Sequence, residues 1–406
     1  MMNLRLFRTA LGTGTFCLLL LLLPRKHHAY PLRITSSPRQ CRASHRQISR
    51  TAVSSAAIDS DGGDPQTPPA GNNLLEQLQR HTTVWADTAD LATVERLACA
   101  AGINDVTTNP SIVAATARRS AGATEKSPFQ VLEARAEAGA ALALEGHELV
   151  AVDLGRRLLD VVPGRVCTQL DIRLTDAGDM VTKARDLVAM YAEGGVAKER
   201  VLIKTPATWA GIRATERLER EGIKCLVTLV CSRVQGRAAA EAGASIIATY
   251  VGRVSDWHKA IISPASTAVV PASEDPGVTL TTDLKDYFVT HGLATEVMGA
   301  SFRSVDQVTA LAGCDHLTIA PGLIDEMAQL PPKEFLDSTG KGGRHQSDPG
   351  DTTSASRLAE KTFIESLGRE ACGTSVLQSS VEGFTRDTIA LEADIAAHLE
   401  KYRLQR

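Results

Sequence analysis

A single lysine follows a short apolar run near the middle of this 406-residue chain. Val201 to Ile203 are apolar and rich in β-branched residues, which predicts a strand buried on both faces. Lys204 follows directly, Pro206 ends the strand, and Thr208 can cap a helix that begins at Trp209. Because burial disfavours the charged form of an amine, Lys204 is a candidate nucleophile toward carbonyl groups. The other interpretation is a lysine whose head group simply reaches water from a strand end.

Other polar side chains follow the apolar runs that we expect to be the neighbouring strands. Singly, each could be an ordinary turn or cap residue, as a helix cap at Asp87 or a turn at Asn109 before Pro110 would be. Together they bring a lysine, a carboxylate, a phenol and two arginines to one end of a sheet. Arginine forks suit phosphate, so a lysine beside them suggests a sugar phosphate held as a Schiff base. In chain order the set is Asp87, Asn109, Gln169, Lys204, Thr228, Tyr250, Arg253, Ser301 and Arg303.

Alternating strand and helix patterns must position these residues. Strands are expected at 81–86, 105–108, 165–173, 201–204, 224–231, 245–252, 295–301 and 316–320. Helices are expected at 91–101, 128–161, 180–193, 209–221, 234–242, 282–290 and 323–330. Eight strands, nearly all followed by helices, predict an α/β fold, a closed (β/α)8 TIM barrel whose strand ends meet at one face. An open doubly wound sheet is the alternative, but the glycine-rich turn typical of it is absent after the first strand.

Two more helices are expected beyond the barrel, at 355–367 and 376–402. We expect them to pack against the barrel as a tail. None of the polar residues in this tail has the spacing of a chemical site, which predicts a solvated helix face.

The first 71 residues differ from the rest. Arg5 and Arg8 precede an apolar block at 16–23, which is too short to span a bilayer comfortably and resembles the core of a signal peptide. Residues 30–58 carry five arginines, many serines and no acidic residue, as transit peptides do, and residues 59–71 have linker composition. This order resembles the two-part leader of proteins sent to the stroma of complex plastids. A secretory signal alone and a membrane anchor are the alternatives. The barrel and its tail would then occupy residues 72–406.

The net charge and the cysteine positions limit the kinds of partner and metal site that can be expected. The leader holds nine of the 44 Lys and Arg residues and three of the 47 Asp and Glu residues, so the remainder has a net charge of −9. A basic surface for nucleic acid is therefore not expected. The six cysteines after the leader form no CxxC pair and no zinc-spaced cluster with histidine, so no metal site is expected.

Several stretches resemble the transaldolase family. The segment Val106 to Ile112, VTTNPSI, is similar to its first signature, and the Lys204 segment is similar to its second. Shorter segments at 84–88, 221–225, 251–253 and 298–303 resemble it in the same order, so the resemblance covers about residues 74–330. It implies a barrel of the class I aldolase type and a role in the pentose phosphate pathway. It also implies catalysis without a metal or a cofactor. The implied substrates are fructose 6-phosphate, sedoheptulose 7-phosphate, erythrose 4-phosphate and glyceraldehyde 3-phosphate, and a homodimer is a candidate assembly.

The resemblance also implies a role for each site residue. Lys204 would form a Schiff base with the ketose donor, and Asp87 would accept a proton as the carbon–carbon bond breaks. Asn109 and Thr228 would hold donor hydroxyls and a catalytic water. The phosphate would be bound by Arg253, Ser301 and Arg303.

Four positions depart from the transaldolase pattern. The family's catalytic glutamate is matched by Gln169, and an amide cannot exchange a proton as a carboxylate does. An asparagine, a serine and a phenylalanine of the family are matched by Leu226, Ala248 and Tyr250. These four residues resemble the fructose-6-phosphate aldolase branch, in which the Tyr250 hydroxyl could orient or relay protons through the catalytic water. A transaldolase, an aldolase that releases free dihydroxyacetone, and a non-catalytic sugar-phosphate sensor are the three hypotheses.

Overall fold

The computed structural model describes residues 73–120, 127–137, 146–262, 270–335 and 358–405. The expected leader and linker lie outside the described residues, and so do parts of two expected helices, 138–145 and 355–357. Among the described residues, no helix is both long and apolar enough to cross a bilayer. Within the same ranges, no group of three or more His, Cys, Asp or Glu residues is placed to hold a metal ion.

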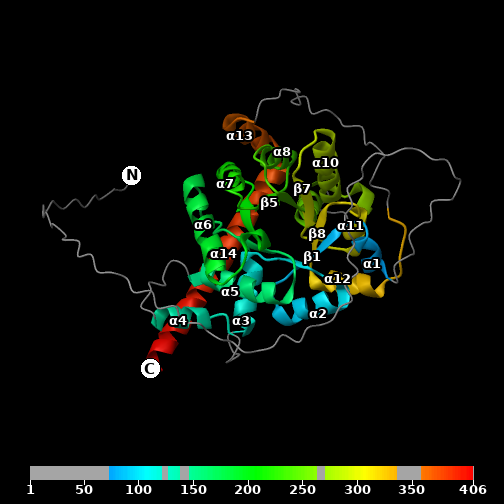
Figure 1. Ribbon diagram of the computed structural model, residues 1–406. Coiled ribbons are helices and arrows are strands. Elements are labelled where there is room, and N and C mark those ends of the chain that lie inside the picture. Colours follow the sequence, from blue (N-terminus) through cyan, green and yellow to red (C-terminus); the bar gives the residue numbers. More distant parts are fainter. Residues whose placement is uncertain (1–72, 121–126, 138–145, 263–269, 336–357, 406) are drawn as a thin grey trace, which may run out of the picture. The chain divides into compact units, whose positions relative to one another are not determined.

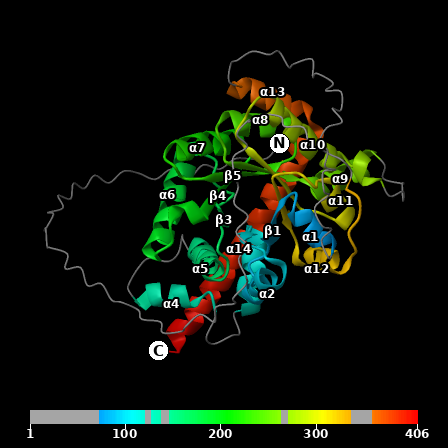
Figure 2. The same cartoon turned by 45° about the vertical axis from the view of Figure 1, so that its right-hand side comes forward.

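Eight parallel strands close into a barrel in chain order, with β1 paired to β8 (Figures 1 and 2). The prediction of a TIM barrel is confirmed. The strands are β1 (Thr83–Asp87), β2 (Asp105–Thr107), β3 (Val166–Gln169), β4 (Val201–Pro206), β5 (Cys225–Val230), β6 (Ile246–Tyr250), β7 (Glu296–Ala300) and β8 (His316–Ile319). β4 continues two residues beyond the expected end, since Pro206 still pairs with β5 as its last residue.

Helices surround the strands, and Figure 2 shows them on the outside of the barrel. They are α1 (Leu74–Gln79), α2 (Leu91–Ala101), α3 (Pro110–Ser120), α4 (Gln130–Glu137), α5 (Gly146–Val161), α6 (Ala177–Glu193), α7 (Trp209–Arg220), α8 (Arg233–Glu241), α9 (Val251–Ile262), α10 (Pro276–Thr290), α11 (Val305–Ala310) and α12 (Pro321–Gln329). Two single-turn 3-10 helices, η1 (Lys198–Arg200) and η2 (Ala272–Glu274), join this set.

Four of these helices, α1, α3, α9 and α11, were not predicted. The prediction of one strand over 245–252 is wrong at its end, because β6 ends at Tyr250 and α9 begins directly after it, at Val251. No turn residue separates β6 from α9, so the sequence does not mark where the strand ends and the helix begins. α3 starts with Pro110, a residue that ends strands but also suits the first position of a helix.

Side chains alternate along each strand between the inside and the outside of the barrel, and the inward ones fill its interior. Seven inward residues form one apolar cluster: Trp85, Cys167, Leu202, Leu226, Ile246, Ala248 and Met298. Because side chains alternate with period two, Asp87 shares the face of Trp85, and Lys204 shares the face of Leu202. Asp87 and Lys204 therefore lie one layer above this apolar cluster, toward the carboxyl ends of their strands.

The tail consists of α13 (Glu360–Arg369) and the long helix α14 (Ala371–Leu404). α14 buries a stripe spaced three or four residues apart: Gly373, Val376, Ser380, Phe384, Thr388, Leu391, Ile395 and Leu399. It packs against α3, α5, α9 and β5, and Figure 1 shows it running from α13 to α4. The prediction that the tail packs on the barrel is confirmed.

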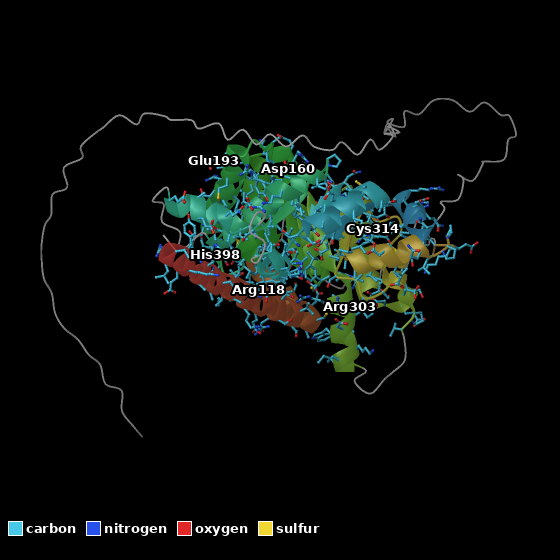
Figure 3. The ribbon with its side chains drawn as sticks, turned by 90° about the horizontal axis from the view of Figure 1, so that it is seen from below. Arg118, Asp160, Glu193, Arg303, Cys314 and His398 are labelled. Atoms are coloured by element: carbon cyan, nitrogen blue, oxygen red, sulfur yellow. The ribbon has the colours of Figure 1, made fainter. Side chains whose placement is uncertain are left out.

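The expectation that the tail's polar groups face solvent is wrong for several of them. Ser380 and Thr388 are buried, and Asp387 and Asp394 form hydrogen bonds with the first and last turns of α3. In Figure 3, Arg118, which pairs with Asp394, lies beside α14. These contacts were missed because their partners are far away in the sequence.

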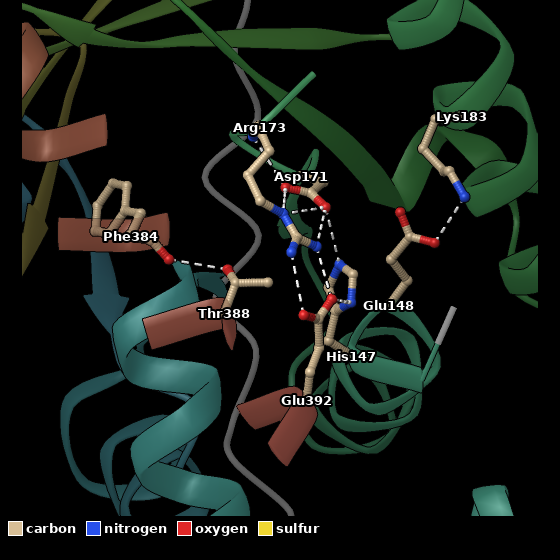
Figure 4. Close-up of polar contacts among 8 residues, drawn as sticks. All are labelled: His147, Glu148, Asp171, Arg173, Lys183, Phe384, Thr388 and Glu392. Carbon is tan, nitrogen blue, oxygen red and sulfur yellow. Dashed lines mark hydrogen bonds and ion pairs between the residues drawn. The ribbon is translucent and has the colours of Figure 1, made fainter. Parts of the chain in front are cut away.

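A polar cluster anchors the middle of α14 (Figure 4). Arg173 binds Asp171 of its own loop with Nη2 at 2.6 Å and Glu392 of α14 with Nη2 at 2.6 Å. The His147 ring lies between the same carboxylates, with Nδ1 3.1 Å from Glu392 and Nε2 3.5 Å from Asp171. Burial lowers the pKa of His147, although both carboxylates oppose this. Burial alone would raise the pKa of Asp171, but hydrogen bonds from Arg173 hold it below its usual value.

Candidate functional site

Lys204 lies deep in the mouth of the barrel. Its side chain is on the buried strand β4, is 4% exposed, and donates from Nζ to the carbonyl oxygen of Thr108 at 3.2 Å. In the strand register, its partners are Gln169 on β3 and Leu226 on β5. Two of the four residues that depart from the transaldolase pattern are therefore the immediate neighbours of the lysine.

Asp87 ends β1 and faces the same interior. Thr107 of β2 donates a hydrogen bond to its Oδ1 at 2.8 Å, and Thr107 also contacts Thr318 of β8 at 2.5 Å between hydroxyl oxygens. Burial raises the pKa of Asp87, whereas the charge of Lys204 and the Thr107 hydrogen bond pull it down. A carboxylate with a raised pKa is a stronger base, which suits a proton acceptor. Asp87 is not a helix cap, because Asp90 caps α2.

Gln169 and Asn109 line a small cavity between the ends of β2 and β3, α5 and α14. Both amide atoms of Gln169 are buried and have no hydrogen-bond partner among the described residues. Asn109 uses its Oδ1 to accept from the backbone N–H of Ile112 at 3.0 Å, so it caps α3. The cavity measures ≈ 30 Å³, enough for at least one water, since a water needs about 10–15 Å³. Its walls also include His147 and Asp171.

Thr228 and Tyr250 form a second polar pair inside the barrel. The Thr228 hydroxyl donates to the Tyr250 hydroxyl at 3.1 Å, and both residues are buried. A phenol that accepts one hydrogen bond can still donate its own proton to a ligand or water. Just beyond Thr228, Leu229 has φ 65° where the register between β5 and β6 shifts, so the backbone leaves the regular ladder there.

The two arginines come from the start of α9, directly after β6, and from the loop after β7. Arg253 is in the first turn of α9, whose N-terminal backbone N–H groups favour anions. Arg303 follows β7 and donates from Nη1 to the carbonyl oxygen of Ser301 at 2.8 Å and to its hydroxyl at 3.2 Å. Ser301 has φ 64°, a left-handed conformation that strains a residue with a side chain. Its carbonyl also accepts from the Gly252 N–H at 3.2 Å, which ties the start of α9 to the loop after β7.

The remaining contacts of the arginines come from residues that the sequence analysis did not select. Arg303 forms an ion pair with Asp256 of α9 at 2.7 Å, and Arg253 donates to Ser380 of α14 at 2.8 Å. A signal for Ser380 was available, because this serine lies within the apolar stripe of a long helix. Thr107 could have been found from its period-two spacing with Asp105, which predicts an inward side chain.

Sequence comparison identifies the family. Residues 84–395 match the family model described as Transaldolase/Fructose-6-phosphate aldolase. The chain belongs to this family. Among relatives named Transaldolase, that of Pseudoalteromonas atlantica is 38% identical over 333 residues, covering 81% of this chain and 100% of the relative. That of Aliivibrio fischeri is 38% identical over 334 residues, covering 80% and 99%. That of Thermosynechococcus vestitus is 38% identical over 345 residues, covering 81% and 82%.

The family match reaches residue 395, beyond residues 74–330, which carry the resemblance in sequence motifs. It therefore includes α13 and most of α14. The tail up to residue 395 thus lies within the region that the family model matches, and α14 packs against α3, α5, α9 and β5.

Proposed function

We propose that this enzyme is a transaldolase that transfers a dihydroxyacetone unit between sugar phosphates through a Schiff base on Lys204. The observation that carries the proposal is the placement of this lysine. Among the described lysines no other is buried, and Lys204 faces the barrel mouth within electrostatic range of Asp87. A buried amine beside a basic carboxylate suits imine formation followed by cleavage next to the imine.

The proposed reaction begins when the Lys204 amine attacks the C2 carbonyl of a ketose phosphate. Loss of water gives the imine. Asp87 then takes the proton of the C4 hydroxyl as the C3–C4 bond breaks, the aldose phosphate leaves, and the electron pair remains on lysine-bound dihydroxyacetone as an enamine. Attack of this enamine on the aldehyde of a second aldose phosphate reverses the steps, so no net proton or electron is consumed.

Proton transfer at the imine stage needs another group, because Gln169 cannot act as an acid or a base. We assign this work to the Tyr250 hydroxyl, which the 3.1 Å hydrogen bond from Thr228 holds in place. Gln169 and Asn109 would position the water that is lost and regained. Arg253, Ser301 and Arg303 would bind the phosphate, because guanidinium groups and a helix N-terminus all favour phosphate oxygens.

A specific observation favours a second candidate, an aldolase that releases free dihydroxyacetone. Gln169 and Leu226 flank Lys204 in the strand register, and Tyr250 is buried beside Thr228. Lys204 thus has an apolar neighbour on one side and an amide on the other. The amide of Gln169 stands where the transaldolase pattern has a glutamate. If the enamine were protonated faster than it met an acceptor, release would replace transfer.

The test is to give the purified full chain fructose 6-phosphate with and without erythrose 4-phosphate. Sedoheptulose 7-phosphate formed only with the acceptor supports transfer. Dihydroxyacetone and glyceraldehyde 3-phosphate released without an acceptor support the aldolase. If neither reaction occurs, the result supports the hypothesis of a non-catalytic sugar-phosphate sensor. Borohydride reduction followed by mass spectrometry then shows whether Lys204 still forms the imine.

Two variants sharpen this test. Lys204→Ala should abolish all turnover, and surviving activity would contradict the Schiff base. Gln169→Glu should raise transfer if the amide merely impairs proton exchange. A loss of activity in this variant would instead mean that glutamine belongs to a different working arrangement with Tyr250.

The subcellular location of the enzyme is proposed from the leader alone. We infer that residues 1–71 direct the enzyme to the stroma of a complex plastid, because a signal-like block precedes an arginine- and serine-rich stretch. A fluorescent protein carrying this leader should accumulate in the plastid of an alga with a complex plastid. Export to the medium would favour the secretory alternative.

A further inference from the structure

The side chain of Arg253 is enclosed between the barrel and the tail. Its guanidinium carbon lies 5.5 Å from the ring centre of Tyr250 on β6 and 5.7 Å from the ring centre of Phe384 on α14. Nη1 donates to the Ser380 hydroxyl at 2.8 Å, and among the described residues this is the only hydrogen bond of the Arg253 side chain. The guanidinium is therefore fixed by packing on two sides and by one polar contact from the tail.

Ser380 is built to accept this hydrogen bond. The residue is 1% exposed, and its hydroxyl donates to the carbonyl oxygen of Val376 at 2.6 Å, one turn earlier in α14. The hydroxyl proton is thereby committed to the helix, and the oxygen lone pairs face the arginine. Phe384, one turn later, is 3% exposed, so the site has a rigid wall of one serine and one ring.

The two arginines of the mouth differ in the donors that they keep free. Arg303 uses Nε and Nη2 for Asp256 at 3.0 and 2.7 Å, and Nη1 for Ser301. Four of its five N–H donors thus have a partner, two of them in an ion pair, and its side chain is 45% exposed. Arg253 is less exposed and has committed Nη1 alone within the described residues. Its remaining N–H groups can therefore reach a phosphate without breaking an ion pair.

We propose that Ser380 and Phe384 of α14 are positioning residues that orient Arg253 for the phosphate of the sugar substrates. The tail helix then forms one wall of the phosphate site, and phosphate affinity depends on how α14 docks. This inference rests on the proposed function, because it takes Arg253 as a phosphate ligand. It concerns substrate binding and leaves the chemistry at Lys204 unchanged.

The test compares Ser380→Ala with Ser379→Ala, a matched control in which the neighbouring serine is exposed. With the full chain, Ser380→Ala should raise the KM for fructose 6-phosphate about tenfold, the effect of one hydrogen bond to a charged group, and leave kcat within about twofold. Inorganic phosphate, used as a competitive inhibitor, should weaken by a similar factor. Ser380→Thr, which keeps the hydroxyl, should restore both values, and Ser379→Ala should match the wild type.

Phe384→Leu provides a second variant if Ser380→Ala does not fold, and it should raise the same KM and the same phosphate inhibition constant. Arg253→Ala separates the two levels of inference. If Arg253→Ala leaves phosphate inhibition unchanged, the phosphate role in the proposed function is wrong. If Arg253→Ala weakens inhibition but Ser380→Ala and Phe384→Leu behave like Ser379→Ala, the role of the tail is wrong. A fall in kcat with unchanged KM in the tail variants would also overturn it.

Discussion

Replacing Gly252 with alanine should disrupt the proposed phosphate site. Gly252 is the second residue of α9, next to Arg253, and the chain around it is crowded. A Cβ atom at this position would lie 2.3 Å from the carbonyl oxygen of Ser301 and 2.8 Å from Cγ of Arg303. The nearest atom is backbone, so it cannot turn aside as the end of a flexible side chain could.

The size of the effect follows from this geometry. Ordinary contact begins near 3.4 Å, so the Ser301 oxygen must move by about 1 Å relative to α9. A displacement of about 1 Å in a binding group lowers activity up to about 10²-fold, so kcat/KM for fructose 6-phosphate should fall about 10- to 100-fold. Overpacking costs about 1–3 kcal/mol, partly offset by the better helix propensity of alanine, about 0.5–1 kcal/mol.

The assay measures KM for fructose 6-phosphate, inhibition by inorganic phosphate, and Tm for each variant. Gly322→Ala is the matched control, because Gly322 is also near the start of a helix, α12, and a Cβ there would meet nothing within 4 Å. This control should gain about 0.5–1 kcal/mol of stability and keep wild-type kinetics. If Gly252→Ala kept the wild-type KM and phosphate inhibition, the close approach of α9 to the loop after β7 would not matter for phosphate binding, and the reasoning would fail.

Three further predictions concern charged groups. Asp87→Asn should abolish turnover yet raise Tm at neutral pH: the folded-state pKa of Asp87 is raised, so its ionised form destabilises the fold, and the gain should shrink as acid protonates the wild-type carboxyl. Asp171→Asn should lower Tm at pH 7: the folded-state pKa of Asp171 is depressed, so its stabilisation is present above the unfolded pKa of about 3.9, and the deficit should close as pH falls below about 4. Glu392→Gln should weaken the anchor of α14 by about 1 kcal/mol in denaturant unfolding, and the loss should largely vanish in an Arg173→Ala background. An Asp171→Asn deficit as large at pH 3 as at pH 7, or additive losses for Glu392 and Arg173, would contradict this account of the cluster.

The sequence predicted the barrel because local patterns encode its parts. Apolar runs of β-branched residues mark strands buried on both faces, and polar residues directly after them lie at the carboxyl ends. Closure follows from the number and alternation of the elements. The placement of Asp87, Lys204, Thr228 and Tyr250 could therefore be predicted, since each is at or near the end of its strand and has the inward phase.

Only the tertiary structure decided what surrounds these residues. The contacts from Arg253 to Ser380, from Ser111 to Asp387 and from Arg173 to Glu392 join residues more than a hundred positions apart. Side-chain spacing along α14 reveals a buried stripe, but it cannot reveal what the stripe touches. The structure also decided that Arg303 is paired with Asp256 while Arg253 keeps donors without a partner among the described residues, because that difference depends on how the start of α9 meets the loop after β7 at Gly252. Short-range pattern thus determined the fold and the reactive groups, and long-range packing determined the shape and charge of the site.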